Sequence, residues 1–157
     1  MSEFGLGPAV KGLARRSPVP VNMHVGVQAR LPNPVEVGVY YIICEALANV
    51  AKHSKATVVN VSIEQCGHVL QVSVHDDGVG GARVSGPGLS GLTDRVDALA
   101  GMMRLVSPPG CGTRLLVRLP IRPGSGPSWV GDMPREATQP GGDGDRTAIT
   151  IGHEASA

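Results

Sequence analysis

Two neighbouring segments in which apolar and polar residues alternate constrain the fold of this chain most. Residues 57–65 (TVVNVSIEQ) and 68–76 (HVLQVSVHD) both alternate in this way. A period of two is typical of β-strands that bury only one face. Cys66 and Gly67 lie between the segments and predict a hairpin turn. Because two strands cannot bury an apolar face by themselves, other elements must cover them.

Helical periodicity elsewhere in the chain predicts that cover. Helices are expected over three segments: residues 6–16, 34–53 and 89–100. Asn33 suits the N-cap of the second helix, and Pro34 suits its first turn. Further strands are expected over residues 20–30 and at MMRLVS and TRLLVRLP, which PPGCG joins as a second hairpin. This order predicts an α+β fold: a two-layer α/β sandwich with a mixed, mostly antiparallel sheet covered on one face by helices.

The composition changes near residue 121. Residues 122–157 are rich in Pro, Gly and small polar residues and show no sustained apolar period. Such a segment buries too little apolar surface to offset its ordering entropy. We therefore expect one folded domain over residues 5–121 and a disordered C-terminal tail over residues 122–157. Within this tail, the alternative for the segment TAITI is an added edge strand.

Charge, aromatic content and cysteine spacing argue against several classes of protein. Lys plus Arg is 14 and Asp plus Glu is 13, so the net charge of +1 does not favour nucleic-acid binding or an anionic membrane surface. No two of the three cysteines form a CxxC pair, which argues against a zinc knuckle and a disulfide scaffold. We therefore expect reduced intracellular thiols. No apolar run approaches the roughly 18 residues of a membrane span, so none is expected.

The second predicted helix carries four polar residues that can bind ions. Glu45, Asn49, Lys52 and His53 lie at positions i, i+4, i+7 and i+8, so helical geometry places them on one face, roughly opposite the apolar stripe. Carboxylate and amide oxygens suit a hard cation such as Mg²⁺, and the basic groups suit phosphates. The alternative is an ordinary solvated helix face with a Glu–Lys pattern.

The segment HDDGVGG follows directly after an apolar strand. A carboxylate at the end of the strand, Asp76 or Asp77, can accept a hydrogen bond from an exocyclic amine such as that of adenine. Gly78 and Gly80 let the backbone turn sharply and approach a ligand. An ordinary hairpin turn is the alternative, because it can have a similar sequence. The alternating acidic ligands of a calcium-binding EF-hand loop are missing.

Two further glycine-containing segments complete the set. Gly86, Gly88 and Gly91 precede and open the helix predicted over residues 89–100, where backbone N–H groups can bind phosphate. The pattern is not a Walker A loop, and a flexible loop is the alternative. GCGT, at residues 110–113, can be a simple hairpin turn.

Together, in this order and at these spacings, the four segments resemble the ATP-binding catalytic domain of sensor histidine kinases. EALANVAKHSKA resembles the N box of that family, HDDGVGG its first glycine box, GPGLSGLTDRV its second and GCGT its closing glycine-threonine element. YYIICEALANVAKHSKA and GLSGLTDRVDALAG are most similar to the NarL-type subgroup. The resemblance covers about residues 5–121 and implies the Bergerat ATP-binding fold.

The resemblance also implies roles for individual residues. Asn49 would ligate Mg²⁺ between the ATP phosphates, with Glu45 supporting the metal, and these two would form the catalytic pair. Asp76 would accept the adenine amino group and Thr113 would lie near the base, whereas Asp77 would occupy the variable position. The other implied nucleotide contacts are Lys52, His53, Gly78, Gly80, Gly88, Leu89, Gly91 and Leu92. Residues 81–91 would form a mobile lid.

Kinases of this kind phosphorylate a histidine on a separate dimerisation domain, and the resemblance therefore implies the same for this chain. That histidine lies in a helix resembling R-x-L-H-D in this subgroup, and no segment here matches it. We therefore expect the catalytic domain of a kinase, without autophosphorylation by itself. The alternatives are an anti-sigma-factor-type serine protein kinase of the same fold and a nucleotide-binding module without kinase activity.

The expected partners follow from the same resemblance. They are the dimerisation domain of the same kinase and, indirectly, a response regulator. No nucleic acid and no direct membrane contact are expected, and the isolated domain is expected to be monomeric. The expected location is the cytoplasm, whether or not the parent kinase is anchored in a membrane.

Overall fold

The two alternating segments lie at the centre of one sheet. In the computed structural model, which describes residues 5–27, 30–83, 86–121 and 148–151, they form β2 (Val59–Cys66) and β3 (Val69–Asp76). The antiparallel register pairs Cys66 with Val69, so the turn consists of Gly67 and His68 and not of Cys66 and Gly67. The prediction is displaced by one residue because β2 continues through Cys66. Gly67, with a φ of 60°, supplies the left-handed backbone that this tight turn requires.

The remaining strands extend the sheet on both sides. They are β1 (Val21–Gly26), β4 (Met102–Val106), β5 (Thr113–Pro120) and β6 (Ala148–Ile151). The described residues form a six-stranded sheet in the order β1-β2-β3-β5-β4-β6. Only β1 and β2 are parallel, and every other neighbouring pair is antiparallel. The prediction of a mixed, mostly antiparallel sheet is therefore confirmed.

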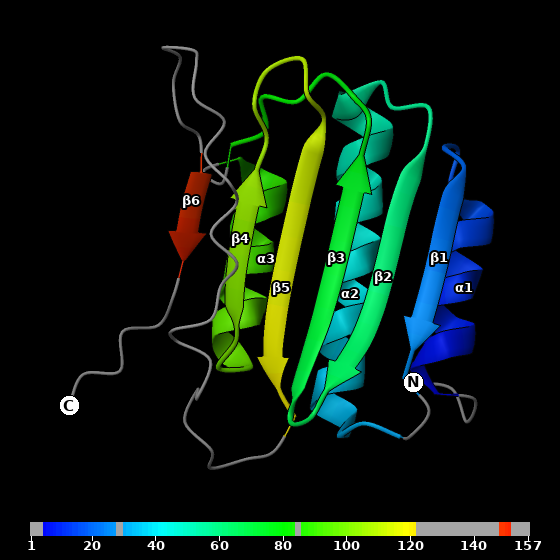
Figure 1. Cartoon of the computed structure of the whole chain (residues 1–157), viewed down its shortest axis with the longest axis vertical. Helices are drawn as coiled ribbons and strands as arrows, with labels where there is room; N and C mark the ends of the chain where they lie inside the picture. Colours follow the sequence, from blue (N-terminus) through cyan, green and yellow to red (C-terminus); the bar gives the residue numbers. More distant parts are fainter. Residues whose placement is uncertain (1–4, 28–29, 84–85, 122–147, 152–157) are drawn as a thin grey trace.

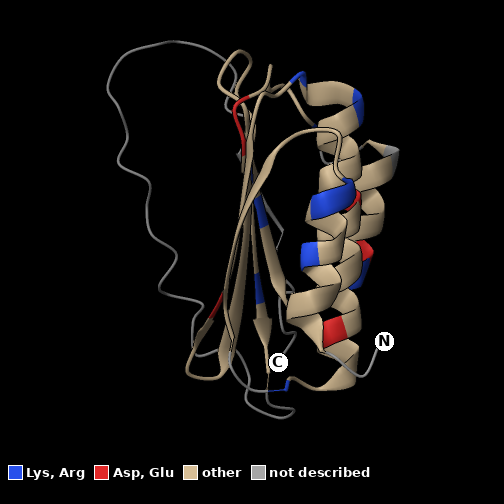
Figure 2. Cartoon of the chain, turned by 90° about the vertical axis from the view of Figure 1, so that its right-hand side faces the viewer, with Lys and Arg blue, Asp and Glu red and all other residues tan. Residues whose placement is uncertain are grey.

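All the helices in the described part of the chain cover the same face of this sheet. They are α1 (Leu6–Arg16), α2 (Asn33–Asn49), its π-helical continuation η1 (Val50–Ser54) and α3 (Pro87–Ala98). They lie behind the strands in Figure 1, and the side view in Figure 2 separates the two layers. The α+β class and the two-layer α/β arrangement are confirmed.

The core lies between α2 and the strands. The predicted apolar stripe of α2, Ile43, Ala46, Leu47 and Val50, is buried there. Each central strand contributes the residues of one face only, such as Val59, Val61 and Ile63 of β2. Burial of this interleaved aliphatic surface stabilises the fold by about 25 cal/mol per Å² removed from water.

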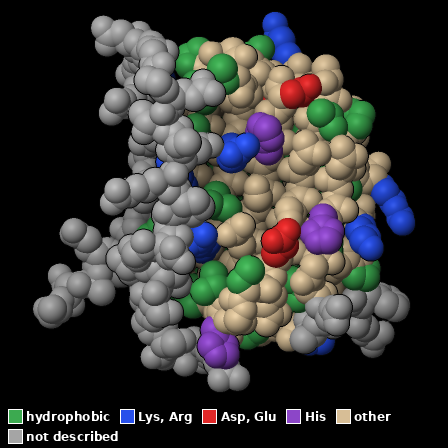
Figure 3. Space-filling model, viewed as in Figure 1, with side chains coloured by type: hydrophobic (Ala, Val, Ile, Leu, Met, Phe, Trp, Pro, Cys, Tyr) green, Lys and Arg blue, Asp and Glu red, His purple; other side chains and the backbone are tan. Residues whose placement is uncertain are grey.

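Over β1 and β2, the opposite face of the sheet is polar and exposed in the described part of the chain. Asn22, His24 and Asn60 are exposed there, alternating with the inward residues of β1 and β2. Figure 3 shows histidine, acidic and basic side chains distributed over this face. The alternation read in the sequence therefore separates a core face from a solvated face.

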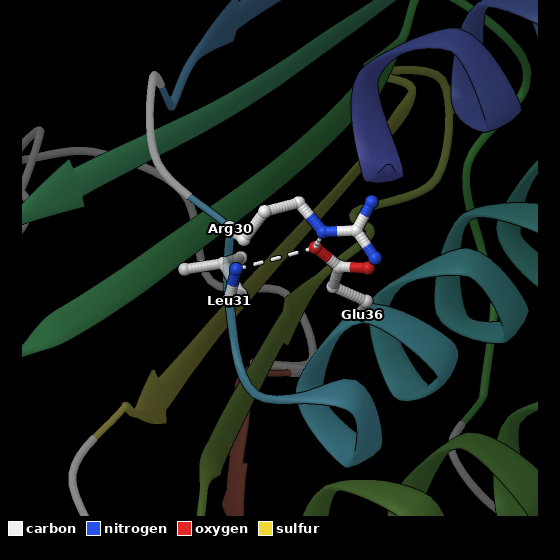
Figure 4. A network of polar contacts seen from close by, with 3 residues as sticks. All are labelled: Arg30, Leu31 and Glu36. Carbon is white, nitrogen blue, oxygen red and sulfur yellow. Dashed lines mark hydrogen bonds and ion pairs between the residues drawn. The ribbon is translucent and has the colours of Figure 1, made fainter. Parts of the chain in front are cut away.

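A buried carboxylate, and not a side-chain cap, organises the start of α2. The helix begins at Asn33 with Pro32 in the N-cap position and no capping side chain, so the prediction of Asn33 as N-cap is wrong. Instead Glu36, 1% exposed, accepts a hydrogen bond from the Leu31 N–H at 3.2 Å. Its Oε1 also pairs with Arg30 Nε at 3.4 Å (Figure 4). Glu36 thus fixes the chain that enters the helix.

The helical segment Asn33–Ser54 has a length and composition that would allow it to cross a membrane. The sequence reading missed this because it looked for an uninterrupted apolar run, whereas the mean hydropathy of an 18-residue window is 1.2. Half of that window is buried inside the domain, where α2 packs against the sheet. We therefore interpret the segment as the core helix of this fold.

A short strand near the C-terminus corrects part of the tail prediction. Ala148–Ile151 form β6, which pairs antiparallel with β4, for example Leu105 with Ile149. The expectation of disorder is wrong for these four residues, and the alternative of an edge strand within TAITI holds. The unpaired edge of β4 supplies the hydrogen-bonding groups that such a strand needs. The rest of the expected tail, residues 122–147 and 152–157, lies outside the described residues.

Candidate functional site

A cavity of about 400 Å³ lies between the end of α2, the strands β3, β4 and β5, and the segment that leads to α3. Seven of the residues predicted as nucleotide contacts line it: Asn49, His53, Asp76, Gly80, Gly88, Leu89 and Thr113. The four sequence segments that contribute them are far apart in the chain. The sheet order and the direction of α2 bring them together.

Asp76 provides a buried hydrogen-bond acceptor at one end of the cavity. It is the last residue of β3 and is 3% exposed. Its Oδ1 accepts the Gly78 N–H at 2.8 Å, and no donor among the described residues pairs with its second oxygen. Val74, Leu105 and Leu115 line the same cavity and make it apolar. A lone acceptor in such surroundings suits a flat heterocycle that carries an amino group.

The neighbouring carboxylate, Asp77, is engaged outside the cavity. Its Oδ1 accepts the N–H groups of Thr57 at 2.8 Å and Val58 at 3.1 Å, and its Oδ2 accepts the Thr57 hydroxyl. These hydrogen bonds, that of the Thr57 side chain first, lower the pKa of Asp77 below its ordinary value of 3.8. Asp77 therefore ties the end of β3 to the start of β2.

Glycines allow the loop after β3 to pack directly on the β4–β5 loop. A Cβ at Gly80 would lie 2.1 Å from the Pro108 carbonyl oxygen, and one at Gly112 would lie 2.1 Å from the Asp76 carbonyl oxygen. Gly78 packs likewise against Ser54 and does not line the cavity. These glycines bring two backbone segments together around Asp76. Both Gly78 and Gly80 were predicted as nucleotide contacts, but only Gly80 lines the cavity.

Asn49 provides the polar group at the other end of the cavity. Its Nδ2 is buried and has no hydrogen-bond partner. Gly88, in the first turn of α3, approaches so closely that a Cβ there would lie 2.6 Å from Asn49 Oδ1. A buried amide with an unsatisfied donor is costly unless a ligand completes its hydrogen bonds. The Nδ2 donor and the start of α3 together fit an anionic group such as a phosphate, whereas a metal ion would need the amide oxygen Oδ1.

The predicted face of Glu45, Lys52 and His53 is divided by the π-helix. His53 lines the cavity, whereas Glu45 lies one helical turn before Asn49 and outside the lining, and Lys52 is exposed away from it. The prediction assumed one α-helical period through residue 53. The wider π turn at Val50–Ser54 changes that period and turns Lys52 outward.

The start of α3 also differs from the prediction. The helix begins at Pro87, so Gly88 and Gly91 lie inside it and residues 87–91 of the expected lid are helical. Leu89 lines the cavity, but Leu92 is fully buried in the core and Gly91 is exposed. Residues 84–85 of the same segment lie outside the described residues.

Sequence reasoning missed most of the apolar wall of the cavity. The missed lining residues are Ala46, Val50, Ser54, Val74, Leu105 and Leu115, whereas Gly81, Ala82, Arg83 and Gly86 belong to the segments predicted as the lid and its glycines. The register pairs Leu115 with both Val74 and Leu105, which makes one continuous wall across three strands. The alternation marked these residues as core, and only the strand order shows that they border a cavity.

The cavity lining thus combines an apolar wall and one buried acceptor with an amide, a histidine and the start of a helix. This combination fits a ligand that carries both a flat base and phosphates. Among the described residues, no group of three or more His, Cys, Asp or Glu forms a metal site. A metal ion here would therefore share its ligands with the bound phosphates.

Comparison with known families agrees with this geometry. Residues 35–123, more than half of the chain, match the family described as "Histidine kinase-, DNA gyrase B-, and HSP90-like ATPase". The chain belongs to this family of ATP-binding domains.

Two curated relatives that the chain matches are both named as histidine kinases. The chain is 34% identical over 134 residues to the sensor histidine kinase NarS of Mycobacterium tuberculosis, covering 78% of this chain and 31% of the relative. It is 33% identical over 102 residues to the signal transduction histidine-protein kinase/phosphatase DegS of Brevibacillus brevis, covering 62% and 26%. The similarity to the NarL-type subgroup is confirmed, and the chain spans about a third or less of these relatives.

Solved structures share the fold. The blue-light activated histidine kinase EL346 of Erythrobacter litoralis superposes with a TM-score of 0.66 at 21% identity, over 74% of this chain and 42% of that chain. The ATP-binding domain of PrrB from Mycobacterium tuberculosis superposes with a TM-score of 0.56 at 24% identity, over 74% and 91%. The near-complete coverage of the second shows that the two share the whole fold of a single domain.

Proposed function

We propose that residues 5–121 are the ATP-binding catalytic domain of a two-component sensor histidine kinase. The domain binds ATP with Mg²⁺ and donates the γ-phosphoryl group to a histidine on a separate dimerisation domain. The observation that carries this proposal is the pairing, in one cavity, of the buried acceptor Asp76 with the buried unsatisfied amide of Asn49. The names of the curated relatives support the choice of a histidine as acceptor.

At the base end, Asp76 accepts a hydrogen bond from the adenine amino group through its second oxygen. Val74, Leu105 and Leu115 pack against the ring and exclude water. A site built around a buried hydrogen bond discriminates strongly against a ligand that lacks the matching donor. Thr113, opposite Asp76 in the β3–β5 register, completes the polar edge beside the base.

At the phosphate end, Asn49 would hold the metal through its amide oxygen, and Glu45 in the preceding turn would support it. Mg²⁺ would supply charge neutralisation of the phosphates. His53, Gly88 and the N–H groups at the start of α3 face the phosphates. Lys52 is the weaker contact because it is exposed and does not line the cavity. Gly78, Gly91 and Leu92 act through packing or backbone geometry.

The chain's own contribution to phosphoryl transfer is positioning. The acceptor nitrogen must meet the γ-phosphorus in line, and this alignment is worth on the order of 7–11 kcal/mol. We propose that the dimerisation domain supplies the acceptor and that a response regulator receives the phosphoryl group afterwards. The reaction takes place in the cytoplasm, and the isolated domain is a monomer.

Phosphoryl transfer in trans tests this function. The chain is incubated with γ-labelled MgATP, alone and with a dimerisation domain from a NarL-type kinase. We expect acid-labile, alkali-stable label on the added domain and none on this chain. Acid-stable phosphoserine on an antagonist protein would instead favour the serine kinase alternative. MgATP binding without any transfer would leave a nucleotide-binding module, and absence of MgATP binding would refute the proposal altogether.

A further inference from the structure

The outer edge of β4 connects the cavity with a segment from near the C-terminus. β4 pairs with β5 on its inner side, and on its outer side Met103 to Val106 pair with β6 (Figure 1). Without β6, β4 would be the last described strand on this side of the sheet. Its outward N–H and C=O groups would then have no strand partner, as at any free sheet edge.

One side chain of β4 forms part of the cavity wall. Leu105, 2% exposed, lines the cavity and pairs with Leu115 of β5 on one side and with Ile149 of β6 on the other. A strand that pairs on both sides opens less readily than an edge strand, because two sets of backbone hydrogen bonds must break. Pairing with β6 therefore restrains this part of the wall.

The end of β4 also holds a loop that borders the cavity. Val106 pairs with Ala148, and Ser107 follows directly. Ser107 is fully buried, its Oγ accepts the Ala82 N–H at 2.9 Å, and its carbonyl oxygen accepts the Gly81 N–H at 2.8 Å. Both Gly81 and Ala82 line the cavity. A displacement of β4 at this end would therefore move the backbone of the cavity lining.

We propose that the outer edge of β4 is a docking site for residues 148–151 of this chain, and that docking of this segment increases the affinity of the cavity for nucleotide. This inference rests on the proposed function and adds a regulated contact to the same site. A segment and a ligand that favour the same arrangement of β4 strengthen each other's binding by the same factor. Release of the segment from β4 therefore weakens nucleotide binding.

The size of the segment suits a reversible contact. β6 has only four residues, all of which pair with β4, so few backbone hydrogen bonds hold it. A free peptide of this length would dock weakly, but attachment to the same chain raises its effective concentration at the edge. The balance between docked and released states can therefore respond to a ligand in the cavity.

Proline substitution in β6 tests the inference. Successive residues of a strand direct their N–H groups to opposite sides, so the double variant Ile149→Pro/Thr150→Pro removes one N–H group that faces β4. We expect its dissociation constant for MgATP, measured by calorimetry on the full chain, to rise about tenfold, which lies in the usual range for coupled sites. The matched control Ile149→Val/Thr150→Val keeps both N–H groups and should bind MgATP like wild type.

Hydrogen exchange of wild type provides a second, independent measurement. Because coupling is reciprocal, saturating MgATP should slow exchange of the β6 amides by about the same tenfold factor. The amides of β1 are the control. This strand forms the opposite edge of the described sheet and contributes no residue to the cavity lining, so MgATP should leave its exchange unchanged.

Several outcomes would contradict the inference. Equal MgATP affinity in the proline and valine variants would show that docking does not influence the cavity, and so would β6 exchange that MgATP leaves unchanged. An equal loss of affinity in both variants would show that the effect does not depend on backbone pairing. If the proline variant fails to fold, the exchange measurement on wild type decides. Absence of MgATP binding by wild type would refute the proposed function itself, whereas binding that is independent of β6 refutes only this inference.

Discussion

Asp76 and Asp77 are adjacent in sequence, but their carboxylates have different surroundings. The alternation of β3 directs Asp76 toward the helices and the cavity, whereas Asp77 lies beyond the strand and is exposed. Asp76 keeps one oxygen without a protein donor, while both oxygens of Asp77 are hydrogen-bonded to Thr57 or Val58. The structure thus supports Asp76 as a ligand-binding residue and Asp77 as a structural one.

Replacing Asp76 by Asn should weaken binding of both ATP and ADP by about 10- to 100-fold, because a charged hydrogen bond is worth about 1.5–3 kcal/mol. Asn keeps the acceptor for the Gly78 N–H but turns a donor toward the adenine amine. Asp77→Asn is the matched control and should change affinity by less than about threefold. Calorimetric titration checks both variants, and the reverse ranking would show that the assignment is displaced by one residue.

Asp77 should instead influence stability in acid. Its pKa is lower in the folded chain than in the unfolded chain, because the folded chain donates hydrogen bonds to the carboxylate. Its contribution to stability is therefore complete above the unfolded value of about 4 and is lost as the pH falls through the folded value. Between pH 5 and 2, urea unfolding should show a smaller decline in Asp77→Asn than in wild type. Parallel declines would show that the hydrogen bonds to Thr57 do not persist in solution.

At the level of elements, the β4–β5 loop offers a test of the close contact beneath Asp76. Gly110 and Gly112 both have positive φ, 79° and 72°, so a side chain causes backbone strain at either position. Only at Gly112 would a Cβ meet the Asp76 carbonyl oxygen, whereas at Gly110 it would meet nothing within 4 Å. Gly110→Ala should cost about 1–2 kcal/mol, and Gly112→Ala clearly more, with loss of nucleotide binding. Equal unfolding free energies for the two variants would contradict the contact.

The start of α2 depends on Glu36 more than on its ion pair. Arg30 is 61% exposed, so Arg30→Gln should cost no more than about 1 kcal/mol. Glu36→Ala leaves the Leu31 N–H without its acceptor and opens a small cavity, so it should cost about 2–3 kcal/mol. Chemical denaturation of the two variants at neutral pH compares them. A larger loss in Arg30→Gln would indicate that the ion pair dominates.

At the level of the whole molecule, bound nucleotide should raise the melting temperature. A ligand at 100 times its dissociation constant stabilises the folded state by about 2.7 kcal/mol. MgATP should therefore raise the melting temperature of wild type by several degrees, and removal of Mg²⁺ by a chelator should reduce the rise. In Asn49→Ala the dependence on Mg²⁺ should disappear while the melting temperature without nucleotide stays close to that of wild type. Asn60→Ala, on the open face of the sheet, is the control. A full Mg²⁺-dependent rise in Asn49→Ala would remove Asn49 from the metal site.

Much of this protein could be predicted from local patterns, because the forces that produce them act over a few residues. Alternation predicted the central hairpin, and helical periodicity predicted α2 and its buried stripe. Glycine, carboxylate and amide residues at family-like spacings pointed to Asp76, Asn49 and Thr113, all of which border one cavity. The errors at Asn33 and Cys66 amount to one residue each, whereas α3 begins two residues earlier and β1 ends four residues earlier than predicted.

Contacts between distant segments decided the rest. The π turn at Val50–Ser54, stabilised by the Ser54 hydroxyl group on the Val50 carbonyl at 2.8 Å, separates Lys52 from His53. The strand order turns Leu105 and Leu115 from core residues into a cavity wall, and the edge of β4 pairs with β6. Ser107 carries no motif of its own, and only the meeting of two loops gives its hydroxyl group hydrogen-bond partners. A sequence records which side chains can form such contacts, but the free energy of each contact depends on a partner that packing brings near.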